Sequence, residues 1–129
     1  MTNSIAGPIR PSCPEELGPR GREVWHRIVA ALSKFDEITD LDKIPLSVYC
    51  RNYEQWIDAV TAINQFGPVI KSTNGFPVQS PYVSIANNAE STMLKIAAEY
   101  GFTPASRRRV FPPKFKSYTF DKDGNQIEM

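Results

Sequence analysis

Apolar residues recur with helical spacing through the middle of the chain, in the stretch from Thr39 to Gly67. Successive positions lie three or four residues apart, the pattern of a helix that packs lengthwise on another helix: Leu46, Tyr49, Tyr53, Trp56, Val60 and Ile63. Thr39 with Asp42 predicts the start of this helix, and Gly67 before a proline predicts its end. Pro45 predicts a kink or a tight first turn.

The apolar arc of this central helix is wider than one partner helix needs. Cys50 and Ile57 extend it on one side, and Val48 extends it on the other. We therefore expect two burial partners, a helix of the same chain and, most simply, a second copy of the protein.

Two further helices flank the central one. The first is predicted over residues 15–35, with a clean helical period from Arg22 onward and Leu17 in a lead-in turn. The third is predicted to start at Ser80-Pro81 and to end at Gly101. The short link after Phe35 predicts that the first two helices are antiparallel neighbours.

Turn signals predict a β-hairpin near residues 69–79, because Asn74-Gly75 lies between two short runs that contain apolar residues. Thr103-Pro104 predicts a short helical turn that carries residues 106–109. The last segment, 118–128, either forms a second small hairpin or stays disordered.

The predicted fold is therefore mainly α: an antiparallel pair of long helices, a small β-hairpin and a third long helix that packs back. We expect a flexible N-terminal arm over residues 1–14 and a helical oligomerisation core over 15–110. A basic, proline-rich tail covers 111–129.

Composition places limits on function. The chain has 129 residues and a net charge of +1, so overall charge does not predict a nucleic-acid partner. Cys13 and Cys50 make a poor disulfide pair and are predicted to be reduced thiols. No apolar run approaches the roughly 20 residues of a membrane span, so we expect a soluble intracellular protein with no membrane partner.

Catalytic and cofactor motifs are missing from the sequence. It holds neither a phosphate-binding loop nor a dinucleotide fingerprint. His26, the single histidine, is interpreted as structural or solvent-facing, and Asp40 and Asp42 are interpreted as helix-start carboxylates rather than a metal pair. We predict no metal, no cofactor and no enzymatic activity.

Positive charge concentrates near the C-terminus, with no acidic residue interspersed: Arg107, Arg108, Arg109, Lys114 and Lys116. One interpretation is a solvated tail that keeps the protein soluble. The other is contact with nucleic-acid phosphates, helped by the interleaved Phe111 and Phe115. A weaker second group of candidates comprises Arg10, Arg20 and Arg22.

The aromatic residues of the helices also admit two interpretations. They belong either to the core or to a subunit interface, since interfaces enrich tryptophan and tyrosine. The candidate interface positions are Tyr49, Tyr53, Trp56, Val60 and Ile63.

Four short motifs follow one another in the chain: Ile38-Thr39-Asp40-Leu41-Asp42, Tyr49-Cys50-Arg51-Asn52-Tyr53, Thr73-Asn74-Gly75-Phe76-Pro77 with Pro81, and Phe102-Thr103-Pro104-Ala105-Ser106-Arg107. In this order they resemble small terminase subunits of tailed double-stranded-DNA bacteriophages. The resemblance covers about residues 14–110, and the tail after Val110 departs from the family pattern.

The resemblance implies a non-enzymatic subunit that assembles into a ring of about eight to ten copies. Such subunits bind the packaging-initiation site of viral DNA in the host bacterial cytoplasm. They recruit and regulate a large subunit that carries the ATPase and nuclease. The alternative is an oligomeric adaptor or structural protein that does not bind DNA.

Overall fold

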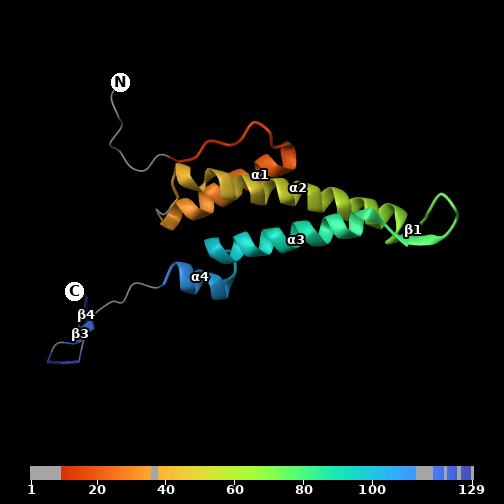
Figure 1. Ribbon diagram of the computed structural model, residues 1–129. Helices are drawn as coiled ribbons and strands as arrows, with labels where there is room; N and C mark the ends of the chain where they lie inside the picture. The colour runs from red at the N-terminus through yellow and green to blue at the C-terminus, as the bar shows by residue number, and fades with distance from the viewer. Residues whose placement is uncertain (1–9, 36–37, 113–117, 121, 125, 129) are drawn as a thin grey trace, which may run out of the picture.

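The computed structural model describes residues 10–35, 38–112, 118–120, 122–124 and 126–128. This part of the chain forms four α-helices, two short 3₁₀ turns and two separate two-stranded antiparallel sheets (Figure 1). In chain order the elements are α1 (Pro19–Leu32), η1 (Ser33–Phe35), η2 (Asp40–Asp42), α2 (Lys43–Phe66), β1 (Val69–Lys71), β2 (Pro77–Gln79), α3 (Pro81–Tyr100), α4 (Pro104–Val110), β3 (Tyr118–Phe120) and β4 (Gln126–Glu128). The mainly helical fold is confirmed, with the predicted hairpin at 69–79. Of the two alternatives for the last segment, the structure has the second small hairpin, β3–β4.

The start of the central helix follows the sequence prediction closely. The Thr39 hydroxyl accepts a hydrogen bond from the Leu41 N–H at 3.3 Å, and the Asp42 carboxylate accepts one from the Thr39 N–H at 2.8 Å. The turn η2 is the tight first turn, and α2 begins directly after it. Pro45 is then the third residue of α2, where a backbone N–H has no partner within the helix, so its missing donor costs little.

The first helix is shorter than predicted. It begins at Pro19, not at Glu15, because Gly18 takes the N-cap position and a proline suits the first helical position. Leu17 lies in a lead-in turn, as expected, with its N–H bonded to the Pro14 carbonyl at 3.5 Å.

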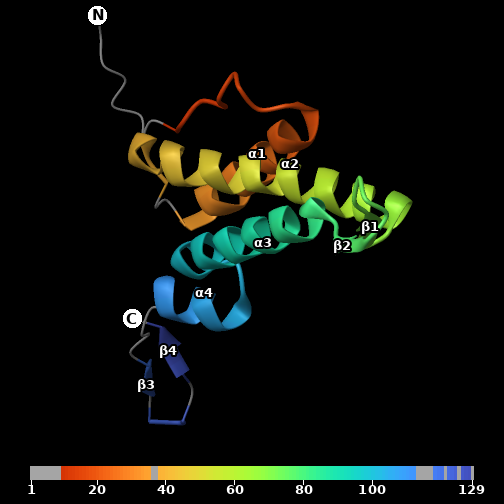
Figure 2. The ribbon, with the colours of Figure 1, turned by 45° about the vertical axis from the view of Figure 1, so that its right-hand side comes forward.

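The main antiparallel pair is α2 with α3, joined by the β1–β2 hairpin. Figures 1 and 2 show these two helices side by side and running in opposite directions, and α2 packs more extensively with α3 than with α1. On α3 the buried positions are alanines, Ala86, Ala89 and Ala97, which let the two backbones approach closely. The expected packing of α1 against α2 is also present, but over a shorter length.

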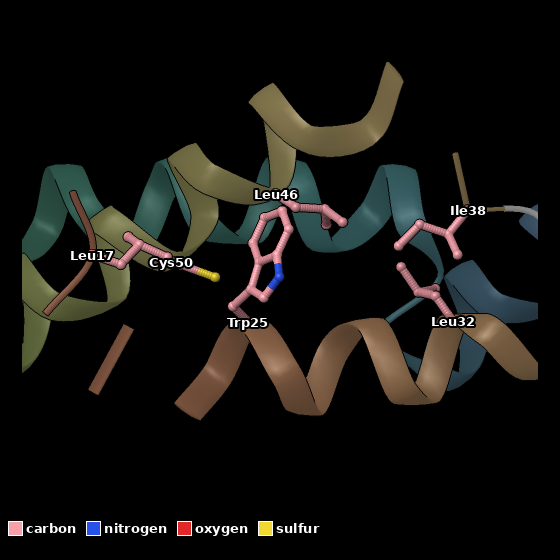
Figure 3. Packing of buried hydrophobic residues seen from close by; sticks show 6 residues of the cluster. All are labelled: Leu17, Trp25, Leu32, Ile38, Leu46 and Cys50. Atoms are coloured by element: carbon pink, nitrogen blue, oxygen red, sulfur yellow. The ribbon is translucent and has the colours of Figure 1, made fainter. Parts of the chain in front are cut away.

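The hydrophobic core lies between α1 and the first half of α2. Trp25 points from α1 toward Leu46 on α2, with Cys50 and Leu17 on one side of the indole and Leu32 with Ile38 on the other (Figure 3). Trp25, Leu46 and Cys50 are the largest side chains that are fully buried in the described part of the chain.

Burial along α2 differs from the predicted stripe. The fully buried positions are Leu46, Cys50 and Ala59, while Tyr53 and Trp56 are half-buried. The physical reason is that two helices of the same chain share the wide apolar arc, α1 over Leu46 and Cys50 and α3 over Ala59. The width of the arc therefore does not itself require a second copy. A second copy would instead cover the apolar residues that stay exposed.

Segments outside the helices also carry structure. Residues 1–9 of the predicted N-terminal arm lie outside the described residues, whereas Pro11 and Pro14 are buried against the helices. The strand pairs β1–β2 and β3–β4 have the registers Ile70↔Val78 and Thr119↔Ile127. None of the described helices is long and apolar enough to cross a membrane.

Candidate functional site

The short helix α4 carries the arginines of the basic cluster and turns back onto the end of α3. Thr103 begins α4 as predicted, because its hydroxyl accepts from the Ser106 N–H at 3.2 Å and the Ser106 hydroxyl accepts from the Thr103 N–H at 3.1 Å. Gly101 ends α3 in the left-handed region with φ +71°. A Cβ there would approach the Phe111 ring to 3.2 Å, so glycine permits the close return of the chain.

Two of the three arginines hold α4 in place. The Arg107 guanidinium donates to the carbonyl oxygens of Gly101 (3.1 Å) and Phe102 (3.3 Å), and Arg109 donates to that of Ala98 at 3.0 Å. These carbonyls lie at and just beyond the C-terminal end of α3, where backbone acceptors lack helical partners and carry partial negative charge. Arg107 and Arg109 therefore act as a cap on α3.

Arg108 is different, because it is exposed and makes no hydrogen bond or ion pair with any residue that the structure describes. All of its guanidinium donors can be used by a partner. Lys114 and Lys116, the other members of the predicted cluster, lie outside the described residues.

The weaker basic group does not join this cluster. Arg22 donates to the carbonyl oxygens of Leu17 and Glu15, both at 2.9 Å, and so holds the lead-in segment against α1. Arg10 and Arg20 are exposed. Figures 1 and 2 place the start of α1 far from α4, so one local patch does not include both groups.

A groove of about 390 Å³, here named the aromatic groove, lies between α1, the middle of α2 and the α3–α4 junction. Residues that define it include Arg27, Ile28, Ala31, Tyr53, Phe102 and Arg107. Two cations, Arg27 and Arg107, lie on its rim, and no carboxylate is among the described residues that line it. Arg27 could not be predicted as a site residue from the sequence, because only the folded chain brings α1 beside α4.

Aromatic contacts fix the floor and one end of this groove. Tyr49 meets Phe102 edge to face, with ring centroids 5.3 Å apart, and Phe35 stacks on Phe111 at 4.2 Å. The Tyr100 hydroxyl donates to Asp42 Oδ1 at 2.8 Å. Burial and this carboxylate raise the pKa of Tyr100, and burial also raises the pKa of Tyr49, so both phenols stay protonated at neutral pH.

The predicted interface residues Tyr49, Tyr53, Trp56, Val60 and Ile63 are all half-buried. Trp56 donates its indole N–H to Glu90 Oε1 at 2.8 Å. Together with Tyr49 these two residues line a second groove, of about 270 Å³, where Leu94 of α3 is 65 % exposed. We name this surface the Leu94 edge of the α2–α3 pair.

The opposite edge of the pair exposes apolar residues as well. Leu41 is 89 % exposed and Ile44 is 75 % exposed, and Val48 follows one turn later. Gln55 shares their side of α2 by helical spacing and lines a hollow of about 340 Å³ with Tyr82 and Ile85 of α3. We name this surface the Ile44 edge.

Catalytic and metal chemistry find little support in the described residues. No group of three or more histidine, cysteine, aspartate or glutamate side chains among them could hold a metal ion. His26 is exposed on α1, which agrees with the solvent-facing one of its two predicted placements. Asp42 accepts a hydrogen bond in the capping box at the helix start. The described Cys13 and Cys50 are free thiols, and burial raises the pKa of Cys50 to about 12. Such a thiol is a poor nucleophile at neutral pH.

Comparison with known protein families identifies the family of this chain. A family model described as phage terminase, small subunit, matches residues 21–116, a range that runs from α1 to beyond α4. No curated protein and no solved structure matches the chain.

Proposed function

The chain belongs to the phage terminase small-subunit family, and on this premise we propose that it is the DNA-recognition subunit of a viral packaging machine. Members of this family act in phage DNA packaging. The proposed subunit forms a homo-oligomeric ring in the cytoplasm of the infected host and binds the packaging-initiation site. It recruits and regulates a large subunit that carries the ATPase and nuclease, and has no catalytic activity itself.

The observation that carries the DNA-binding part is the arrangement of α4. Arg107 and Arg109 fix this helix on the end of α3, and the fixed helix presents Arg108 to solvent. A guanidinium on a rigid support binds phosphate with little loss of side-chain freedom. Lys114 and Lys116 follow in the sequence and extend the positive charge, with Arg20 and Arg22 as a more distant group.

The observation that supports a ring is the presence of two unlike apolar edges on the α2–α3 pair. The Leu94 edge is grooved, and the Ile44 edge exposes Leu41, Ile44 and Val48. A subunit with two different contact surfaces associates head to tail, and a head-to-tail arrangement closes into a ring when the rotation permits. Tyr49 and Trp56 then serve the interface through the Leu94 edge, and exposed leucine and isoleucine become buried.

A second candidate function is an oligomeric adaptor that does not bind DNA. The hydrogen bonds of Arg107 and Arg109 favour it, because they give two of the three arginines a purely structural use. The two candidates differ in whether Arg108 contributes to DNA affinity.

Salt-dependent DNA binding by the Arg108→Ala variant tests the proposal, with Lys71→Ala as the matched control. Lys71 is exposed, carries the same charge and lies on β1 at the far end of the α2–α3 pair. We expect Arg108→Ala to weaken binding and to lower the salt slope by about one per contacting copy. The control should keep both, and native mass spectrometry should report an oligomer throughout.

A strictly monomeric protein without salt-dependent affinity for DNA overturns the proposed function. If the oligomer binds DNA equally well with and without Arg108, the DNA contact is made by other residues and the assignment to Arg108 is wrong. An oligomer with no DNA affinity favours the adaptor.

A further inference from the structure

We propose that the aromatic groove is the docking site for the C-terminal β3–β4 hairpin of a second copy of this chain. The inference rests on the oligomer of the proposed function and adds a contact that neither edge of the α2–α3 pair provides.

The groove is a preformed apolar surface. Its floor is held by the edge-to-face contact between Tyr49 and Phe102, and the hydrogen bond from Tyr100 to Asp42 fastens the end of α3 to the start of α2. Side chains held in this way lose little freedom when a ligand binds. A groove of about 390 Å³ accommodates one or two large apolar side chains.

The rim of the groove selects for negative charge. Arg107 is held by the carbonyls of Gly101 and Phe102, and Arg27 is held by Glu23 in an exposed ion pair at 3.0 Å. Each guanidinium has more donors than these contacts use. Because no carboxylate is among the described lining residues, the groove fits a segment that carries both apolar and acidic side chains.

The C-terminal hairpin has this chemistry. Its sequence from residue 118 onward contains three carboxylates against one lysine, and its apolar residues include Tyr118, Phe120 and Ile127. The strands β3 and β4 pair only over Tyr118↔Glu128 to Phe120↔Gln126. A two-stranded hairpin of this size is marginally stable in water by itself, so it gains by packing on another surface.

The placement of the hairpin favours a groove of another copy. Figures 1 and 2 show β3 and β4 beyond α4, on the side away from α1, whereas the groove of the same chain opens between α1 and α3. The proposal therefore assigns the hairpin to a neighbouring copy in the head-to-tail assembly.

Isotope-mixed cross-linking of the full chain tests the proposal. In the Arg27→Lys variant, a carbodiimide couples the new amine at position 27 to a carboxylate that lies beside it. We expect coupled peptides that join position 27 to the segment 118–129. After equal amounts of ¹⁴N and ¹⁵N protein are mixed and reassembled, about half of these peptides should contain one chain of each isotope, as random pairing between copies requires.

A groove-filling substitution supplies the matched comparison. Ala31 lines the groove and Ala30 does not, and both are exposed on α1. Added to Arg27→Lys, Ala31→Trp should reduce the mixed-isotope coupling to background, whereas Ala30→Trp should leave it unchanged. Circular dichroism checks that both variants keep their helices.

Coupled peptides that are all of a single isotope, with no mixed pairs, would place the hairpin in the groove of its own chain and overturn the proposal. Absence of coupling from an assembly that native mass spectrometry shows to be oligomeric would also overturn it. A monomer in that measurement counts against the proposed function itself, so the two failures are distinguishable.

Discussion

The carboxylate of Glu54, on α2, lies against the first turn of α1, where its Oε2 accepts a hydrogen bond from the Gly21 N–H at 3.3 Å. The first N–H groups of a helix lack partners within the helix and carry partial positive charge. Glu54 therefore caps a helix that has no capping side chain of its own, since its N-cap residue is Gly18. This contact couples the start of α1 to the middle of α2.

The contact makes a prediction about Gly21. A Cβ at this position would lie 2.7 Å from the Glu54 Cδ atom, so the carboxylate must move and lose its hydrogen bond. We expect Gly21→Ala to destabilise the protein by about 1–2 kcal/mol. In the Glu54→Ala background the same change should stabilise by about 0.5–1 kcal/mol, because alanine is the better helix former. Urea unfolding of the four proteins measures both; the same sign in both backgrounds would contradict this explanation.

The stacked pair of Phe35 and Phe111 fastens the end of α4 to the end of α1. Since Phe35 is exposed and Phe111 half-buried, Phe111→Ala should cost about 1–2 kcal/mol, less than the 3–5 of a fully buried phenylalanine. Hydrogen exchange should rise within residues 104–110 and stay unchanged in the middle of α3. Phe111→Leu, which keeps an apolar side chain, serves as the milder control. Uniformly unchanged exchange would show that the arginine caps alone hold α4.

Trp56 tests the half-buried stripe of α2. Its indole packs beside Tyr53 and donates to Glu90, and it is only partly buried, so Trp56→Ala should cost about 1–3 kcal/mol. Trp56→Phe removes the hydrogen bond and should cost about 0.5–1 kcal/mol. Chemical denaturation gives both values, and native mass spectrometry at low concentration should show a weakened assembly for the alanine variant. An assembly as strong as the parent's would remove Trp56 from the interface.

The buried Cys50 thiol predicts a loss of stability in alkali. Burial raises its pKa to about 12 in the folded protein. The unfolded chain ionises near the ordinary value of about 8.5. Below the pKa of the thiol in the unfolded chain, the buried neutral thiol makes its full contribution to stability. This contribution is lost as the pH rises from the unfolded-state pKa to the folded-state pKa, because in this range the thiol is ionised only in the unfolded chain. The free energy of unfolding should fall between about pH 8.5 and about pH 12, and Cys50→Ala should flatten that fall. A parallel slope in both proteins would contradict the assignment.

The two edges of the α2–α3 pair predict a mixing experiment. Leu94→Glu and Ile44→Glu each place a charge on one exposed apolar position, so each variant alone should fail to form a ring. In a head-to-tail assembly an equimolar mixture retains one intact contact, between the Ile44 edge of the first variant and the Leu94 edge of the second. Analytical ultracentrifugation should therefore detect a heterodimer in the mixture. Ser84→Glu, on an exposed position of α3 that helical spacing sets apart from both edges, is the control that should leave the ring intact.

Local chemistry explains why so many element boundaries could be predicted. The caps at Thr39, Ser80 and Thr103 depend on side chains within three residues of the backbone groups that they bind. The same holds for Gly101 and for the Asn74-Gly75 turn, where Gly75 has φ +82°. Both partners of such a contact are close together in the sequence, so the contact can be predicted from a single sequence.

The distribution of burial along α2 could not be predicted in the same way. Helical spacing identified the correct face, but it favoured the large residues Tyr53 and Trp56 over Cys50 and Ala59. Which position lies deepest depends on where small residues of another helix allow close approach, and this is a property of the pair. The use of Arg107 and Arg109 and the place of Arg27 beside α4 also follow from tertiary packing alone.

The two carbonyl oxygens that accept hydrogen bonds from Arg107 limit which substitutions this position can tolerate. A lysine there would keep the formal charge, but an ammonium on a flexible stem cannot bridge both oxygens in one plane. Substitutions that look conservative by charge would therefore release α4 and spread Arg108 over many orientations. Sequence change at position 107 is therefore limited by the planar shape of the guanidinium group and not only by its positive charge.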